Sequence, residues 1–365
     1  MIKVKDFEFS DPILESIWKE MEQDKFTSMF QSFFWNKYWY EKVGREDEKS
    51  VLFIKVAFSE GKPIAIFPFI LRKIFLFKII ELLGREQFDY KAPILKGFHN
   101  SEKIWKAVDK SLPKHDIKIL ERVPNLPELK FREVFQSMKV SLKQESKQIL
   151  LSSNPENLDF LSKRLRKDIF RMKRKLSELG NLTISQTRNT KEYKMVIKET
   201  IKQKEKKYLD TGAKNIFLDN KIKDFYIDLI NENLDEVQIH LSYLSLDNEI
   251  LASHLGFIHK DTFYYILPSF KEGHLNKFSP GKILLFELIK LSIEKGLKKF
   301  DLTVGTEEYK KRWSNSSMEV ISFIEYRNIK GAIYYFYIKF IFFLKNNTKT
   351  RLFFMNLNKK FNFLK

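Results

Sequence analysis

The chain has 365 residues, which is more than one ordinary hydrophobic core contains, and this length predicts two domains. Hydrophobic residues make up 43% of the sequence and aromatic residues 15%, so a globally disordered chain is excluded. Cysteine is absent, which excludes disulfides, thiolate catalysis and cysteine-based zinc sites.

The formal net charge is +19, and two explanations stay open for it. One is a lysine-rich composition without a specific partner. The other is attraction to an anionic ligand, such as a CoA-type cofactor, a tRNA or a membrane surface. Local clusters of basic residues therefore have to decide between them.

No targeting or membrane-spanning segment is expected. The start, Met1 to Asp6, has no apolar core of signal-peptide length. A spanning helix needs about 18 or more apolar residues, and the nearest approach, Gly331 to Leu344, is interrupted by Lys339. We expect a cytoplasmic protein.

The first half alternates short apolar runs with turn residues. An aromatic run from Phe30 to Trp39 predicts a buried helix, and Val51 to Phe58 with Pro63 to Leu71 predicts a hairpin around a glycine turn. The sequence then predicts a strand from Phe75 to Gly84, a helix from Ser101 to Leu112 and a strand from Asp116 to Glu121.

The second half begins with helices. Apolar residues spaced by three and four between Leu161 and Leu179 predict a helix ended by Gly180, and two further helices are expected at Lys191–Tyr208 and Asn220–Asn233. An antiparallel meander, a helix and two strands follow: Gln238–Leu246, Ile250–Ile258, Thr262–Pro268, Gly281–Lys295, Leu297–Thr303 and Met318–Arg327.

Both halves thus have antiparallel strands followed by a helix and a strand, which predicts a mixed α/β (α+β) fold made of two related halves. We expect the first domain at residues 1–150 and the second, which carries the chemistry, at 151–328. Residues 329–365 form a basic aromatic tail.

A motif in the second half carries a family resemblance. It consists of Phe278-Ser279-Pro280-Gly281-Lys282, a helix of about four turns, Phe300-Asp301, and then Gly305 with Tyr309-Lys310 and Trp313. It resembles the GNAT-like acyltransferase family associated with bacterial cellulose and exopolysaccharide biosynthesis (CelD-like), which is related to the FemAB-type aminoacyltransferases. The resemblance extends over about residues 1–327 and implies two GNAT-like halves, each a mostly antiparallel sheet with flanking helices.

Physical chemistry gives the start of the motif a function. Ser279, Pro280 and Gly281 lie where free N–H groups and the positive end of a helix dipole meet, which suits a cofactor pyrophosphate, and Lys282 adds a charge. A plain serine-capped helix explains the same residues. The ordinary GNAT loop, with Arg or Gln and spaced glycines, is not present here.

The resemblance also implies catalytic residues. Asp301 would hold the amine nucleophile or accept its proton, although a structural pair with Lys310 is the alternative. Tyr309 would protonate the leaving thiolate, or it packs a helix on the sheet. Lys310 would bind a carboxylate or phosphate, unless it is a solvated charge. Gly305 and Trp313 complete the motif as substrate-binding positions.

His254 is a further catalytic candidate, because it shares a strand face with the small residues Ala252 and Gly256 and titrates near neutral pH. A structural histidine is the alternative. The other histidines lack metal-ligand spacing, so no metal is expected.

Two basic segments remain. The helix Lys163–Lys175 has eight basic residues and one acid, so Arg164 and Lys167 are candidates for binding an anionic donor or acceptor, or they line a solvated face. Residues 328–365 contain no acid and many aromatics, which suits an anionic bilayer or a helix docked on the protein.

The predicted function is acyl transfer, from acetyl-CoA or another acyl-CoA to a sugar, an amino acid or a lipid-linked precursor in envelope or polysaccharide biosynthesis. Aminoacyl transfer from tRNA in the FemAB manner is the alternative. A non-catalytic membrane or nucleic-acid binding protein on a degenerate fold is a second alternative. Peripheral attachment to the inner membrane face through the tail is also considered.

Overall fold

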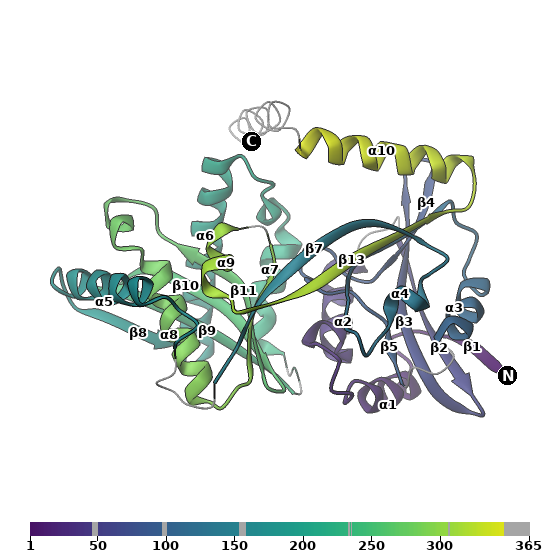
Figure 1. Ribbon diagram of the computed structural model, residues 1–365, viewed down its shortest axis with the longest axis horizontal. Helices are drawn as coiled ribbons and strands as arrows, with labels where there is room; N and C mark the ends of the chain where they lie inside the picture. Colours follow the sequence, from purple (N-terminus) through teal and green to yellow (C-terminus); the bar gives the residue numbers. More distant parts are fainter. Residues whose placement is uncertain are drawn as a thin grey trace. The chain divides into compact units, whose positions relative to one another are not determined.

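The computed structural model describes residues 1–45, 50–96, 101–152, 158–232, 234, 236–305 and 307–346. Its contacts divide the described chain into two compact units, one built on residues 1–146 and 318–344 and the other on residues 147–317. The chain passes between them within β7 (Lys139–Leu150) and again at the start of β13 (Ser316–Tyr326) (Figure 1). The domain limits expected from the sequence stay a prediction.

The first unit is a mixed sheet with helices on it. β2, β3 and β4 are antiparallel neighbours, α3 follows, and β6 then pairs in parallel with β4. β13 returns from the far end of the sequence to pair antiparallel with β6. The bounds of the strands are β1 Ile2–Phe7, β2 Ser50–Ser59, β3 Lys62–Ile74, β4 Phe77–Leu82, β5 Ile94–Leu95 and β6 Ile117–Pro124.

The predicted aromatic helix at Phe30–Trp39 is interrupted at Ser32. This residue has an extended backbone, and its Oγ accepts the Trp35 N–H at 3.2 Å, so a new helix starts there. The helical segments of this unit are α1 Pro12–Met21, η1 Met29–Gln31, α2 Phe33–Trp39, the π-helical turn η2 Tyr40–Gly44, α3 Ser101–Lys110, α4 Phe131–Val134 and α10 Ile329–Asn346.

The second unit repeats this order. β9, β10 and β11 form the predicted antiparallel meander, α8 follows, and β12 pairs in parallel with β11. β8 pairs with β9 at one edge, and the end of β7 flanks β12. The strands are β8 Leu182–Gln186, β9 Val237–Leu246, β10 Glu249–His259, β11 Thr262–Phe270 and β12 Lys299–Val304.

Helices cover both faces of this second sheet. α6 is held by polar contacts, because Thr200 Oγ1 lies 2.6 Å from Ser253 Oγ and Gln203 Nε2 donates to the Ile250 carbonyl at 3.0 Å. α8 is apolar and packs with α5 on an aliphatic and aromatic core. The helices are α5 Lys163–Ser177, α6 Thr190–Thr211, η3 Ile216–Leu218, α7 Asn220–Asp228, η4 Leu229–Asn231, η5 His274–Phe278, α8 Pro280–Glu294 and α9 Glu308–Trp313.

The predicted mixed α/β fold with two related halves is confirmed. Each half has three antiparallel strands, then a helix, then a strand parallel to the third: β2-β3-β4-α3-β6 in one and β9-β10-β11-α8-β12 in the other. No helix among the described residues is long and apolar enough to cross a membrane.

Candidate functional site

The predicted motif residues lie at the start of α8 and at the end of β12 with the helix α9 that follows it, while Arg164 and Lys167 lie on α5 and His254 on β10. Between these two places, β11 and β12 separate. Their parallel ladder, within the described residues, joins Thr262–Tyr264 to Lys299–Asp301 and ends there, although β11 continues to Phe270 and β12 to Val304. Ile266 is an extra residue opposite the step from Leu255 to Gly256 of β10, which forms a bulge in β11.

Thr303 marks the point where β12 turns away. Its φ is 60°, a left-handed conformation that is strained for a β-branched residue. It is buried, and its Oγ1 lies 3.5 Å from the Tyr265 carbonyl oxygen of β11. Strain of this kind costs about 1–3 kcal/mol and persists only where the surrounding structure holds it. The separation of the two strands is therefore built into the fold.

Asp301 lies directly before this turn and is only 2% exposed. Its Oδ2 accepts a hydrogen bond from Gln148 Nε2 of β7 at 3.0 Å, and its Oδ1 accepts the Thr303 N–H at 2.8 Å. Two donors fix the plane of the carboxyl group. A buried carboxylate held this way is suited to orienting an amine or taking its proton.

Lys310 is buried beside the same turn. Its Nζ lies 3.2 Å from the Val304 carbonyl oxygen, 3.5 Å from the Thr303 carbonyl oxygen and 3.2 Å from Glu307 Oε2. A Cβ at position 305 would meet the ends of the Glu307 and Lys310 side chains, so Gly305 leaves room for this ion pair as it stands. Through these contacts Lys310 links the end of β12 to Glu307, the residue before α9.

Tyr309 is partly buried and precedes Lys310 on α9. Burial raises the pKa of its phenol above the usual value, and the negative charge of Glu307 adds to the effect. Tyr309 therefore keeps its proton throughout the neutral range. It is able to donate a hydrogen bond or a proton from α9, the helix that follows β12.

Lys204 of α6 joins this group, and it was not predicted from the sequence. It is partly buried, and burial is the main reason why the pKa of its amine falls to about 8; Glu307 opposes the shift, while Lys310 and Lys207 add to it. Helix α6 carries many lysines, and nothing in the sequence separates Lys204 from the others.

At the start of α8, Ser279 has a left-handed backbone and its side chain makes no capping hydrogen bond. Its carbonyl accepts the N–H groups of Lys282 at 2.9 Å and Ile283 at 3.2 Å. Pro280 has no N–H, so within the described chain the Gly281 N–H is the first-turn donor left for a ligand. Gly281 lies against Phe270 of β11, and Lys282 is exposed.

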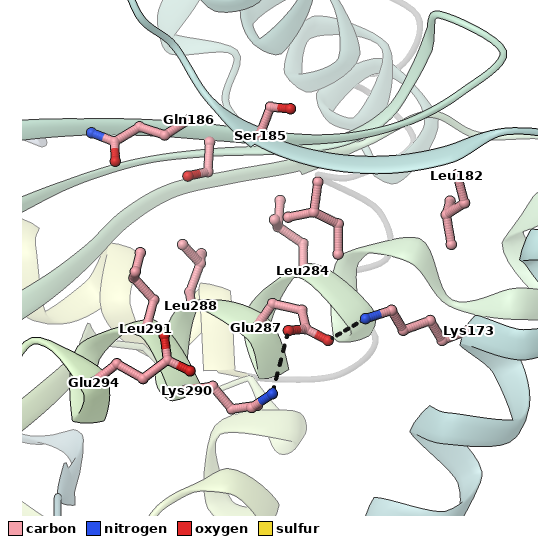
Figure 2. Close-up of a pocket in the computed structure, with 12 residues that line it drawn as sticks. Lys173, Leu182, Ser185, Gln186, Leu284, Glu287, Leu288, Lys290, Leu291 and Glu294 are labelled. Atoms are coloured by element: carbon pink, nitrogen blue, oxygen red, sulfur yellow. Dashed lines mark hydrogen bonds and ion pairs between the residues drawn. The ribbon is translucent and has the colours of Figure 1, made fainter. Parts of the chain in front are cut away.

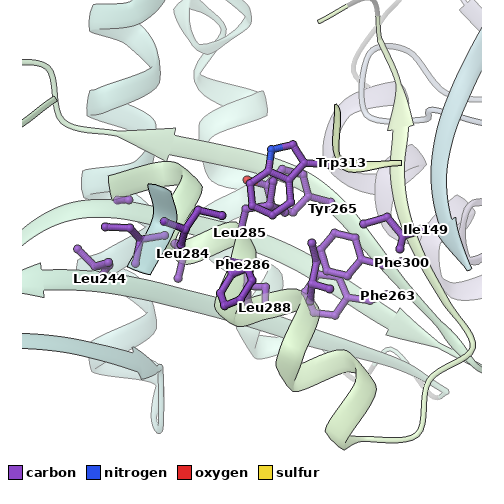
Figure 3. Packing of buried hydrophobic residues seen from close by; sticks show 14 of the residues in the cluster. Ile149, Leu244, Phe263, Tyr265, Leu284, Leu285, Phe286, Leu288, Phe300 and Trp313 are labelled. Atoms are coloured by element: carbon purple, nitrogen blue, oxygen red, sulfur yellow. The ribbon is translucent and has the colours of Figure 1, made fainter. Parts of the chain in front are cut away.

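His254 and Trp313 are enclosed by the core rather than exposed to a ligand. His254 stacks on Tyr265 with ring centroids 4.0 Å apart, and neither ring nitrogen has a hydrogen-bond partner among the described residues. Burial lowers the pKa of His254 well below 6.5, so the ring is neutral. Trp313 lies in the core that joins α8 to the sheet (Figure 3).

Arg164 and Lys167 are exposed on α5, and neither makes an ion pair within the part of the chain that the structure describes. Helix α5 packs on α8 and on η5, the segment that leads into Ser279. Both residues therefore lie on the same layer of the second unit as α8. The structure places Asp301 and Lys310 at the same turn after β12, with Tyr309 next to Lys310 on α9, and it leaves Arg164 and Lys167 on a separate helix.

A pocket of about 400 Å³ opens between α5, β8 and α8 (Figure 2). Glu287 lies on its floor, 2.7 Å from Lys173 and 4.0 Å from Lys290. Leu284 and Leu288 add an apolar wall. None of the predicted site residues lines this pocket, and the Glu287 carboxylate is paired with two lysines. We therefore do not place the chemistry there. Among the described residues there is no cluster of three or more His, Asp or Glu that could hold a metal.

Comparison with known proteins supports a GNAT-type domain. Residues 163–311 match the family described as the acetyltransferase (GNAT) domain. The chain is similar in structure to FemX, with a TM-score of 0.62 and 10% identity over 89% of this chain and 98% of FemX. It is also similar to a conserved protein of unknown function from Bacteroides thetaiotaomicron, with a TM-score of 0.55 and 13% identity over 89% of this chain and 100% of that protein.

At such identities the likeness shows the fold alone, and no curated protein matches the chain in sequence. Asp301, Tyr309 and Lys310, the separated strands and the start of α8 all lie within the matched residues. Residues 163–311 therefore match a GNAT domain, and the chain as a whole has a mixed α/β fold similar to that of FemX.

Proposed function

We propose that the protein is an acyltransferase that moves an acyl group from the thioester of an acyl-CoA, such as acetyl-CoA, to an amine or hydroxyl acceptor. The observation that carries this proposal is the position of Asp301. It is a buried, doubly hydrogen-bonded carboxyl at the exact end of the β11–β12 ladder, where two parallel strands separate inside a GNAT-type domain.

In the proposed reaction, the amine nitrogen of the acceptor attacks the thioester carbonyl carbon and forms the C–N bond. Asp301 takes the proton that the amine loses. Backbone N–H groups of β11 near Phe263–Ile266 stabilise the tetrahedral oxyanion, and the C–S bond then breaks. Tyr309, which holds its proton before turnover, protonates the leaving thiolate.

The start of α8 fits the donor's phosphates in part. Gly281 N–H, Lys282 and the positive end of the helix dipole are the groups that would hold an anion there. Pro280 removes one N–H that a glycine loop would offer, so this site has fewer donors than the ordinary GNAT loop. Arg164 and Lys167 on α5 would add positive charge for the donor or for an anionic acceptor.

The remaining predicted residues have supporting roles in this proposal. Lys310 and Gly305 fix the turn after β12, and Trp313 packs α9 on the core beneath it. His254 takes no part in the reaction proposed here. The catalytic role predicted for it from the sequence stays a prediction. The acceptor we propose is a sugar, an amino acid or a lipid-linked precursor of the envelope or of a polysaccharide. The location we propose is the cytoplasm, with peripheral attachment to the membrane.

Aminoacyl transfer from tRNA, in the FemAB manner, is the second candidate. It is favoured by the concentration of basic residues on α5, of which Arg164 and Lys167 are exposed and make no ion pair within the described residues. It requires the same Asp301 chemistry on an ester rather than a thioester, so the two candidates differ in the donor.

The test is to measure which donor the purified protein binds and turns over. We expect calorimetry to show that the protein binds CoA. We also expect the protein to release the CoA thiol from acetyl-CoA when an amine is added. Lys282→Ala should weaken CoA binding by about tenfold, the effect of one charge-assisted contact. Lys295→Ala, at the other end of α8, is the matched control and should leave binding unchanged.

Bound RNA that is released by charge reversal at Arg164 and Lys167, with no CoA binding, would select the tRNA candidate. Binding without turnover of either donor would reject the proposal of an enzyme.

A further inference from the structure

Helix α10 is apolar on two opposite faces. One face is buried in the first unit through Tyr334, Tyr335 and Ile338. The other face is exposed to solvent and recurs at helical spacing, at positions i, i+4, i+7, i+8 and i+11: Ile329, Ile333, Phe336, Tyr337 and Phe340, each more than half exposed. A helix that only covers a core needs the first face and not the second.

The orientation of α10 is fixed, so the exposed stripe cannot rotate inward. Asn328 Nδ2 donates to Asp116 Oδ1 at 2.7 Å, and Asn328 Oδ1 accepts the Gly331 N–H at 2.9 Å. A Cβ at position 331 would overlap the carbonyl oxygen of Asp116, the residue before β6. The glycine therefore allows α10 to lie directly against the start of β6. Tyr334 packs against Phe77 of β4, with the two ring centroids 5.1 Å apart and the rings tilted.

The turn between β3 and β4, which lies beside the buried face of α10, carries a second exposed apolar group. Phe75 is 88% exposed and Leu76 is 77% exposed. Phe75 also has a φ of 51°, a conformation for which a tight hairpin turn ordinarily uses Gly or Asn. The flanking residues, Ile74 and Phe77, pack with Tyr334 and Ile338 of α10, so the turn and the helix are neighbours (Figure 1).

The exposed charged residues of the turn and of α10 are all lysines within the described residues. Lys73 and Lys78 flank the turn, Lys330 and Lys339 lie on α10, and all four are exposed. Helix α10 contains no acidic residue. The acids nearby have partners: Glu81 pairs with Arg72 at 3.1 Å and Glu121 with Lys91 at 3.5 Å. Asp116 is buried and accepts hydrogen bonds from the Lys78 N–H at 2.8 Å and from Asn328 Nδ2 at 2.7 Å. Exposed aromatics bordered by exposed lysines, with the neighbouring acids paired or buried, are complementary to an anionic lipid surface.

We propose that Phe75, Leu76 and the exposed stripe of α10 form a docking surface for an anionic membrane. α10 would lie in the plane of the interface with its stripe among the acyl chains, the turn would insert beside it, and the four lysines would contact lipid headgroups. The inference gives residues to the peripheral location proposed above, and it does not depend on the proposed reaction.

The test is co-sedimentation of the full-length protein with vesicles. Vesicles of phosphatidylcholine with phosphatidylglycerol should bind the protein, and vesicles of phosphatidylcholine alone should bind at least tenfold less. Phe75→Ser with Leu76→Ser, and separately Phe336→Gln with Phe340→Gln, should each weaken binding by at least tenfold. All four positions are exposed, so the melting temperature should not change.

Leu179→Gln with Leu218→Gln is the matched control, because both residues are exposed leucines of the second unit. It should bind like the unchanged protein. Full binding by the Phe75/Leu76 and Phe336/Phe340 variants would overturn the proposal and place lipid binding elsewhere in the chain. A dimer in the absence of lipid that these variants convert to a monomer would overturn it in favour of a second copy of the chain. Since sedimentation needs no turnover, neither result depends on the enzymatic activity.

Discussion

Gln148 Nε2 donates a hydrogen bond to Asp301 Oδ2 at 3.0 Å, across two strands that are 153 residues apart in the sequence. The backbone of the same segment is tied to its surroundings, since Asn315 N–H donates to the Gln148 carbonyl at 3.2 Å. The candidate carboxyl is thus oriented from β7, outside the residues that match the GNAT family. β7, the strand next to β12, therefore contributes a side chain to the site and also extends the sheet.

The sequence predicted the α8–β12 order because long apolar runs have clear periodicity. It did not predict β7, whose polar residues from Lys139 to Gln148 hide the strand pattern, and so the partner of Asp301 was missed. Thr303 was missed because a β-branched residue in a left-handed conformation contradicts local propensity and is imposed by tertiary structure. Lys204 differs from the other lysines of α6 by its surroundings alone.

For His254, we predict that replacement by Phe reduces the loss of stability in acid. Burial lowers the pKa of His240 and His259 to about 4 and that of His254 well below 6.5. As the pH falls below 6.5, the unfolded chain takes up protons that the folded chain refuses, so stability falls. His254→Phe keeps the stack on Tyr265 and removes one such proton.

Melting temperatures from pH 7 to pH 4.5 check this prediction. The curve should be flatter for His254→Phe than for the unchanged protein. His274→Phe, at an exposed position, is the control and should leave the curve unchanged. A curve for His254→Phe as steep as that of the unchanged protein would show that the ring is protonated when folded.

For Lys204, we predict that replacement by Met stabilises the fold at pH 7. The folded amine has a pKa of about 8, against about 10.4 for an unfolded lysine. Between these values the unfolded chain holds the extra proton, so the stability of the unchanged protein rises with pH in this window. Met removes both the burial penalty at pH 7 and this rise.

The difference in unfolding free energy between Lys204→Met and the unchanged protein should therefore be largest near pH 7 and shrink toward pH 10. Denaturant titrations at several pH values measure it. Lys202→Met on the same helix, where the side chain is 80% exposed, should show no such trend. A constant difference for Lys204→Met would mean that the amine is solvated.

For α5, we predict that Arg164→Glu with Lys167→Glu raises the KM for the anionic donor or acceptor by about tenfold, without a change in kcat. Both residues are exposed, and exposed charges contribute about 0–1 kcal/mol to stability, so the melting temperature should hold. Negative charge in the first turns also suits the helix dipole.

Arg174→Glu with Lys175→Glu makes the same change in net charge at the other end of α5 and serves as the control. Its effect on KM should be small. Equal effects of the two pairs would show a general response to net charge. A large drop in melting temperature with an unchanged KM would show that the first turns of α5 are structural.

The central claim is that the Asp301 carboxylate takes part in acyl transfer, and Asp301→Asn tests it. Asn keeps the shape and still accepts the Thr303 N–H, while a flip of the Gln148 amide restores the second hydrogen bond. The fold should therefore survive. The Asn side chain cannot take a proton from the nucleophile, so the rate should fall by about a hundredfold or more.

Gln148→Leu is the matched control, because it removes the hydrogen bond and leaves the carboxylate. It should reduce the rate much less than Asp301→Asn does, even if it melts earlier. The most direct measurement is turnover of the donor by Asp301→Asn, with the melting temperature taken on the same preparation. A folded variant with turnover reduced about a hundredfold or more is the predicted result, and a folded variant with full turnover would contradict the account.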